Sequence, residues 1–229
     1  MLLHGVGLRS GVWAPQIEAL CSRHDVVAMD MPGHGGSSLP PPDACLADYS
    51  RAVLALLDGL GIVGAHVVGH SMGALVALDF ALDHPDRVLG LVAMNAVFCR
   101  TPEQTRAVMA RVGSTDEAAS PRDWSGTIER WFGHPVPGAL RDAAARVRDL
   151  LHGIDPVGYA RTYRLFATSD AAHSQKPRRV FAVMARDGQL MRQSRPGLVV
   201  TSVPKCQSEK RGFSMHCIFM RRYRSLIAE

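Results

Sequence analysis

Cysteine is scarce in this sequence and shows no pairing pattern. The five cysteines, at positions 21, 45, 99, 206 and 217, are odd in number and widely scattered, without a Cys-x-x-Cys motif. Neither a disulfide framework nor a cysteine-based zinc site is therefore indicated. We expect free thiols, most of them buried.

Long apolar runs are also missing. No stretch approaches the roughly 18 to 20 apolar residues that a membrane-spanning helix needs. The first residues carry neither a basic segment nor a small-residue cleavage site, so they do not predict a signal peptide. With 229 residues, of which 47% are hydrophobic and 21% charged, the chain has the composition of a globular domain with a modest insertion. We expect a cytoplasmic protein without a membrane partner.

Lysine is absent from the first 175 residues, and charge is unevenly distributed. Residues 172–229 carry 12 basic and 3 acidic side chains, whereas residues 1–171 carry 14 and 18. A basic segment of this kind can bind nucleic acid. It holds no recognised nucleic-acid-binding module and no interleaved aromatic residues, so we expect no nucleic-acid partner.

Short apolar runs bounded by turn residues alternate with helical patterns along residues 1–99. This alternation favours an α/β fold, in which crossover helices join parallel strands. The run 88–97 is almost wholly apolar, as expected where helices cover both faces of a sheet. The expected strands are 1–3, 25–30, 65–68 and 88–97, and the expected helices are 12–21, 46–60 and 74–82.

Helical periodicity dominates from residue 100 to about residue 168, with breaks at prolines 121, 135 and 137. We interpret residues 100–170 as a helical cap inserted between a first core part, 1–99, and an atypical C-terminal core part, 171–229. Two strand-like runs, 180–184 and 198–203, and a final helical run, 217–228, are expected in that last part.

The pattern Gly-x-Ser-x-Gly occurs at residues 69–73, between a strand-like run and a helical run. In this context it predicts a nucleophile elbow, a strained strand-to-helix turn that exposes the serine side chain. Glycines flank the serine because side chains there would collide with the neighbouring strand and helix. The start of the helix offers N–H groups and partial positive charge to a developing oxyanion. Ser71 is therefore the candidate nucleophile.

Three motifs, in this order, resemble the α/β-hydrolase superfamily: His-Gly-Val-Gly at 4–7, Asp-Met-Pro-Gly-His-Gly-Gly-Ser at 30–37 and the Ser71 motif. The resemblance covers roughly residues 1–170. It implies a mostly parallel sheet flanked by helices, with an inserted helical cap. The family's usual N-terminal hairpin has no counterpart in the sequence, which begins at what resembles the third strand.

The resemblance also assigns roles around the serine. It implies an oxyanion hole made by the backbone N–H groups of Val6 and Met72. His4 and His34 would then be structural residues that hydrogen-bond the loops beside the site and do not act as bases.

A serine nucleophile needs a histidine base that a carboxylate orients. In the family order, the acid follows a late strand and the histidine lies near the C-terminus. Asp187 follows the strand-like run 180–184, and His216 is the one histidine after the late strands. The surrounding motifs differ from the family pattern. Two interpretations of the C-terminal part follow. It is either a divergent form of the family's last strands with a working acid and histidine, or, from about residue 172, a sequence unrelated to the family, as after a frameshift.

The expected chemistry is acyl transfer to water, with Ser71 as nucleophile, His216 as base and Asp187 orienting it. The resemblance implies hydrolysis of a small-molecule carboxylic ester or lactone. Alternatives are a carbon–carbon bond hydrolase, a haloperoxidase-like enzyme, and an inactive relic or small-molecule binder. We expect no cofactor and no metal, because neither a dinucleotide motif nor a metal-ligand cluster occurs.

Overall fold

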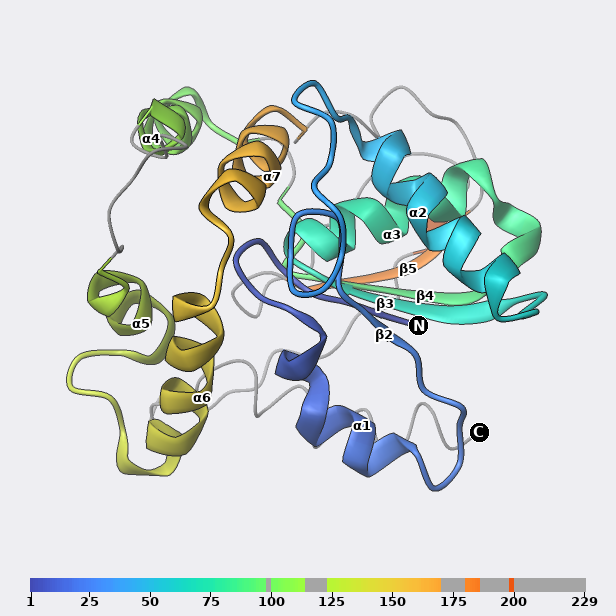
Figure 1. Cartoon of the computed structure of the whole chain (residues 1–229), viewed down its shortest axis with the longest axis horizontal. Helices are drawn as coiled ribbons and strands as arrows, with labels where there is room; N and C mark the ends of the chain where they lie inside the picture. The colour runs from blue at the N-terminus through green and yellow to red at the C-terminus, as the bar shows by residue number, and fades with distance from the viewer. Residues whose placement is uncertain (98–99, 114–122, 170–179, 186–197, 200–229) are drawn as a thin grey trace.

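The computed structural model describes residues 1–97, 100–113, 123–169, 180–185 and 198–199 (Figure 1). Six strands form one sheet in the order β2-β1-β3-β4-β5-β6, and every neighbouring pair is parallel. The strands are β1 (Leu2–Leu3), β2 (Ala28–Met29), β3 (Ala65–His70), β4 (Val88–Met94), β5 (Val180–Ala185) and β6 (Leu198–Val199). The predicted α/β architecture is therefore present.

The strand order places β1 between β2 and β3, so the chain changes direction across the sheet at β1. In open α/β sheets, ligands bind beyond the carboxyl ends of the strands at such a switch point. Because the strands are parallel, the segments that follow β1, β2 and β3 all leave the sheet at the carboxyl ends of the strands. All three predicted family motifs lie at these strand ends, and the serine motif spans the end of β3 and the start of α3.

Helices cover both faces of the sheet, with α2 (Leu46–Gly59) and α3 (Met72–Asp83) on one side and α1 (Ala14–Leu20) on the other (Figure 1). Helix α3 is the centre of the core, because every residue from Met72 to Leu82 is buried. A helix that is apolar nearly all round belongs inside a protein. The main apolar cluster joins α3 to α2 and to strands β3 and β4.

In the described residues between β4 and β5, four α-helices lie to one side of the sheet (Figure 1). They are α4 (Pro102–Gly113), α5 (Ser125–Phe132), α6 (Arg141–His152) and α7 (Pro156–Thr168). A second apolar cluster packs α5 against α6 and includes Leu8 from the loop after β1. The limits of the cap, 100–170, stay a prediction, although these helices and their separate cluster agree with an inserted unit.

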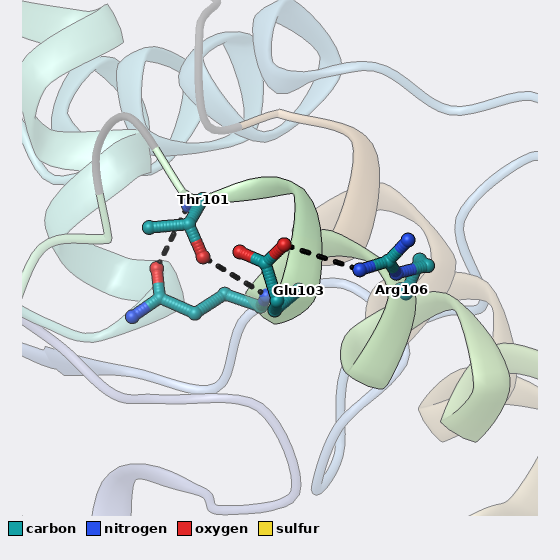
Figure 2. A network of polar contacts seen from close by, with 4 residues as sticks. Thr101, Glu103 and Arg106 are labelled. Carbon is teal, nitrogen blue, oxygen red and sulfur yellow. Dashed lines mark hydrogen bonds and ion pairs between the residues drawn. The ribbon is translucent and has the colours of Figure 1, made fainter.

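Helix α4 begins with a reciprocal cap that the sequence encodes. The Thr101 backbone N–H donates to the Gln104 side chain at 3.0 Å, and the Gln104 N–H donates to the Thr101 hydroxyl at 3.3 Å (Figure 2). An Arg106–Glu103 ion pair follows at 3.1 Å. This pattern satisfies two N–H groups that the first turn of a helix leaves without partners.

Helix α7 is fixed to the core by polar contacts along its length. The buried hydroxyls of Tyr49, on α2, and Thr162, on α7, are 2.8 Å apart, and Arg161 donates to the Pro40 carbonyl at 2.7 Å. At the end of the helix, Arg100 donates to the carbonyl oxygens of Ala167 and Phe166, both at 3.1 Å. These contacts hold α7 against α2, against the loop that follows β2 and against the residue that precedes Thr101.

Two glycines allow α7 to approach that loop closely. A Cβ atom on Gly158 would lie 2.0 Å from the Gly33 carbonyl oxygen. Gly33 itself has a φ of +80°, a value that other residues rarely adopt. The sequence shows a Gly-rich loop and a helix start, but only the tertiary structure shows that they touch.

Several expectations need adjustment. The strand expected at 25–30 is limited to Ala28–Met29, and the strand expected at 88–97 ends at Met94. Cys21 and Cys45 are exposed free thiols, so the expectation of burial is wrong for these two. Residues 200–203 and the helix expected at 217–228 lie outside the described residues. Among the helices described, none is long and apolar enough to cross a membrane.

We expect Gly158→Ala to lower the free energy of unfolding by about 1–3 kcal/mol, because the new methyl group has no room against Gly33. The measurement is equilibrium unfolding in urea. Gly126→Ala is the matched control, since that glycine lies in α5 with nothing within 4 Å of an added Cβ. If both variants were equally stable, the close approach of α7 to the loop would be wrong.

Candidate active site

Ser71 occupies a strained turn between β3 and α3. Its φ is 56° and its ψ is −115°, whereas most non-glycine residues avoid positive φ. The Ser71 N–H donates to the Met94 carbonyl oxygen at 2.8 Å, and the Ser71 carbonyl accepts from Ala74 at 3.0 Å. The backbone on both sides of the serine is therefore fixed by β4 and by the first turn of α3, so its strained conformation is held in place.

The two glycines that flank Ser71 are required by packing. A Cβ on Gly69 would lie 2.1 Å from the Gly73 carbonyl oxygen, and a Cβ on Gly73 would lie 2.4 Å from the Leu3 carbonyl oxygen. No real Cβ atom approaches backbone so closely. The spacing of the motif thus follows from two close contacts, that of the end of β3 with the start of α3 and that of α3 with the end of β1.

The loop after β1 lies against the serine turn. A Cβ atom placed on Gly5 would be 3.3 Å from the Cβ of Ser71, so the two backbones are close neighbours. Residues 5–8 form a tight turn, closed by a hydrogen bond of 3.2 Å from the Leu8 N–H to the Gly5 carbonyl. Val6, a predicted oxyanion donor, lies in this turn, next to Gly5.

His4 and His34 join the loops that follow β1 and β2. His4 is fully buried; its Nε2 accepts from the Met31 N–H at 3.0 Å, and its Nδ1 donates to the Gly5 carbonyl at 2.8 Å. His34 accepts from the Gly7 N–H at 3.0 Å through Nε2 and contacts the Pro32 carbonyl at 3.2 Å through Nδ1. This arrangement agrees with the structural role expected for both histidines.

Both histidines are held in the neutral form. Burial, together with the neighbouring His34, lowers the pKa of His4 to about 3, although the Gly5 hydrogen bond and Asp30 oppose the change. Burial likewise lowers the pKa of His34. A backbone N–H can only donate, so each Nε2 must be unprotonated and each Nδ1 carries the hydrogen.

Asp30 completes the connection between the two loops, and sequence reasoning gave it no individual role. Its carboxylate accepts from the Ser10 N–H at 2.6 Å and from the Gly36 N–H at 3.0 Å. Burial alone would raise the pKa of Asp30, but these hydrogen bonds outweigh burial and keep the pKa low. The position of Asp30 in the sequence, directly after a strand and ahead of a Gly-rich loop, is the feature that could have indicated this role.

The cap helices contact the same turn. A Cβ atom on Gly7 would lie 3.1 Å from the Tyr159 ring and 3.3 Å from Ile154 and Leu151. The Tyr159 ring in turn packs edge-on against Trp124 and is stacked with Tyr163. Trp124 and Tyr163 are buried, so they belong to the core of the cap, whereas Tyr159 is half-buried beside the candidate site.

The structure brings three of the predicted site residues to one place. Ser71 is half-buried at the turn, Met72 is fully buried as the first residue of α3, and Val6 lies in the adjoining turn. Asp187 and His216 lie outside the described residues, and their roles stay a prediction. Within the described ranges, no group of three or more His, Cys, Asp or Glu side chains could hold a metal ion.

Comparison with known proteins identifies the family. The chain matches the model of the alpha/beta hydrolase fold family over residues 1–191. It therefore belongs to the α/β-hydrolase family, as the three motifs predicted. The match extends past residue 170, where the resemblance seen in the sequence ended. It includes β5 and Asp187 but not His216.

A curated relative from Acinetobacter baylyi, named as an (E)-2-((N-methylformamido)methylene)succinate hydrolase, is 32% identical over 76% of this chain. The match covers 65% of that relative and as little as 26% of other curated relatives, so the chain spans less than two thirds of their lengths. Most of these curated relatives are named as hydrolases, and each extends beyond the matched segment.

Solved structures agree in fold. A hydrolase from Pseudomonas aeruginosa PA01 is 28% identical with a TM-score of 0.65, over 80% of this chain and 69% of that one. The enol-lactonase from Burkholderia xenovorans LB400 is 27% identical with a TM-score of 0.65, over 80% and 70%. The predicted α/β-hydrolase fold is confirmed.

We expect Ser71→Gly to be more stable than Ser71→Ala by about 1 kcal/mol, because glycine adopts a φ of 56° without a Cβ penalty. Thermal and urea unfolding of the two variants measure the difference. The pair Ser125→Gly and Ser125→Ala, on the exposed first residue of α5, should show the opposite order, since alanine favours helix. The same order at both positions would contradict backbone strain at Ser71.

The stability of the protein should fall as the pH drops from 6.5 towards 3. The pKa of His4 is about 3 in the folded state, below its unfolded value of 6.5, so the unfolded chain takes up the proton first. Each pH unit in this window costs at most about 1.4 kcal/mol for this group. Urea unfolding at a series of pH values measures the slope.

The variants His4→Gln and His24→Gln separate His4 from other acid effects. His4→Gln should flatten the slope between pH 6.5 and 3, whereas His24→Gln, at an exposed position, should keep it. An unchanged slope in His4→Gln would argue against a buried neutral His4.

Proposed function

We propose that this protein hydrolyses a carboxylic ester or lactone through an acyl-serine intermediate formed on Ser71. The observation that carries the proposal is the turn at Ser71, whose φ of 56° puts a half-buried serine at the start of a helix and beside the loop after β1. A strained nucleophile elbow of this kind is the recurring serine site of the fold. Family membership supports the hydrolase class, and the cleavage of an ester or lactone bond is our inference.

In the proposed mechanism, the Ser71 hydroxyl attacks the substrate carbonyl carbon while His216 removes its proton and Asp187 orients the histidine. The carbonyl oxygen becomes an oxyanion, which the N–H groups of Met72 and Val6 would stabilise. Collapse of this intermediate expels the alcohol, which takes the proton from His216. Water then attacks the acyl-serine in the same way and releases the acid.

The placement of Met72 supports its part in this mechanism. Met72 is the first residue of a twelve-residue helix, so its N–H belongs to the first turn, where N–H groups lack helical partners and the helix dipole is positive. Preorganised donors of this kind cost no reorganisation during the reaction, and removing one typically lowers kcat by about 100–1,000-fold.

A second candidate substrate is an amide. The Acinetobacter baylyi relative, 32% identical over 76% of this chain, is named for a substrate with an N-methylformamido group. The same serine chemistry cleaves amides when the leaving nitrogen is protonated. A substrate panel for this protein should therefore contain N-formyl enamides besides esters and lactones.

We expect Ser71→Ala to lower ester hydrolysis by at least about 1,000-fold and to abolish covalent labelling by a fluorophosphonate probe, because both require the serine oxygen. Hydrolysis of p-nitrophenyl esters and mass spectrometry of the labelled peptide measure the two effects. Ser125→Ala is the matched control, since Ser125 is exposed on α5.

The outcomes separate the alternatives. Labelling that persists in Ser71→Ala would overturn the assignment of the nucleophile. A wild-type protein that is folded but inert towards every ester, lactone and amide, and towards the probe, would favour the inactive relic. Activity that is lost in a folded His216→Ala variant would support a C-terminal part that supplies the catalytic histidine.

A further inference from the structure

The turn that carries Val6 has a conformation set by one peptide group. Residues 5–8 are closed by the Leu8 N–H to Gly5 carbonyl hydrogen bond, and Gly7, the third residue, has a φ of +80°. This is the value of the third residue in a type II turn, whereas a type I turn has a negative φ there. The two types differ in the orientation of the central peptide, which here joins Val6 to Gly7.

His34 contacts that central peptide directly. The Gly7 N–H belongs to it and donates to His34 Nε2 at 3.0 Å, across 27 residues of sequence. The other ring nitrogen, Nδ1, contacts the Pro32 carbonyl at 3.2 Å, which leaves Nε2 as the acceptor. The ring is only 2% exposed, so water cannot readily replace this bond. Rotation of the peptide would leave a buried donor and a buried acceptor unsatisfied, which is unfavourable.

The surroundings hold the ring and the turn in register. Asp30 accepts from Ser10, which follows the turn, and from Gly36, which follows His34. Tyr159 of the cap also lies against Gly7, where an added Cβ would be 3.1 Å from its ring. The peptide between Val6 and Gly7 is thus enclosed by the loop after β2 and by the cap.

We propose that His34 is a positioning residue for the oxyanion hole: by accepting the Gly7 N–H, it fixes the turn so that the neighbouring Val6 N–H faces the carbonyl oxygen of the substrate. This inference rests on the proposed function for its link to catalysis. His34 does not touch the reacting atoms, and it transfers no proton. Its neutral imidazole supplies the acceptor for the Gly7 N–H.

The test compares three variants of His34. Glutamine places its terminal oxygen four bonds from Cα, as Nε2 is in histidine, and can still accept from Gly7. Asparagine is polar but one bond shorter, so it can replace Nδ1 towards Pro32 and cannot reach Gly7. Leucine fills the space without any acceptor. His24→Leu, at an exposed position, controls for the loss of a histidine.

In ester hydrolysis, we expect His34→Leu and His34→Asn to lower kcat by about 10–100-fold, less than the full removal of an oxyanion donor, with KM changed by less than about threefold. His34→Gln should retain kcat within about fivefold of wild type, because glutamine still accepts from the Gly7 N–H and so keeps the donor in place. A loss of kcat equal in all three variants, or a change confined to KM, would overturn the link to the oxyanion hole.

Amide hydrogen exchange of Gly7 tests the structural step without any activity. The Gly7 N–H should exchange at least about tenfold faster in His34→Asn than in wild type and His34→Gln, because its acceptor is removed. The Val68 N–H, bonded to the Met1 carbonyl at 2.9 Å, is the internal reference for global unfolding.

The two readouts distinguish the possible failures. Unchanged Gly7 exchange in His34→Asn overturns the positioning role, whatever the activity. Faster Gly7 exchange with unchanged kcat overturns the role in catalysis. If wild-type protein neither hydrolyses esters nor reacts with the probe, the proposed function fails, and exchange at Gly7 still decides whether His34 holds the turn. If His34→Leu does not fold, the glutamine and asparagine variants carry the comparison.

Discussion

The contact between the end of β1 and the first turn of α3 is the constraint on which the site depends. Gly73 meets the Leu3 carbonyl so closely that no side chain fits between them. This contact sets where α3 begins, and Ser71 is the residue that must make the sharp turn into it. The strain at the serine is thus a consequence of core packing, since α3 is buried along almost its whole length.

The polar loops are arranged around that constraint. Two buried neutral histidines and one carboxylate accept hydrogen bonds from backbone N–H groups of the loops after β1 and β2. Glycine-rich loops have high conformational freedom when unfolded, and such side-chain acceptors restrict them to one conformation. The loops are therefore preorganised by the protein itself, as oxyanion stabilisation requires.

The cap is joined to the core through these same loops. Helix α7 approaches the loop after β2 at Gly33, and Tyr159 contacts the turn after β1 at Gly7. A displacement of α7 would also displace both loops, because the tight contacts leave no free space for independent movement. The residues beside the candidate oxyanion hole thus belong to three segments that are far apart in the sequence.

The sequence by itself determined the α/β class, the strand-to-helix turn at Ser71 and the glycines around it, because period and glycine spacing are local signals. It did not determine the partners of His4, His34 and Asp30, since hydrogen bonds across 20 to 27 residues leave no local pattern. The sequence also did not determine that strands end at Met29 and Met94, because a strand ends where its pairing with neighbouring strands ends, whatever the propensity of its residues. Only the tertiary structure decided which acceptor meets which N–H and how closely α7 approaches the site, since both depend on the packing of distant segments.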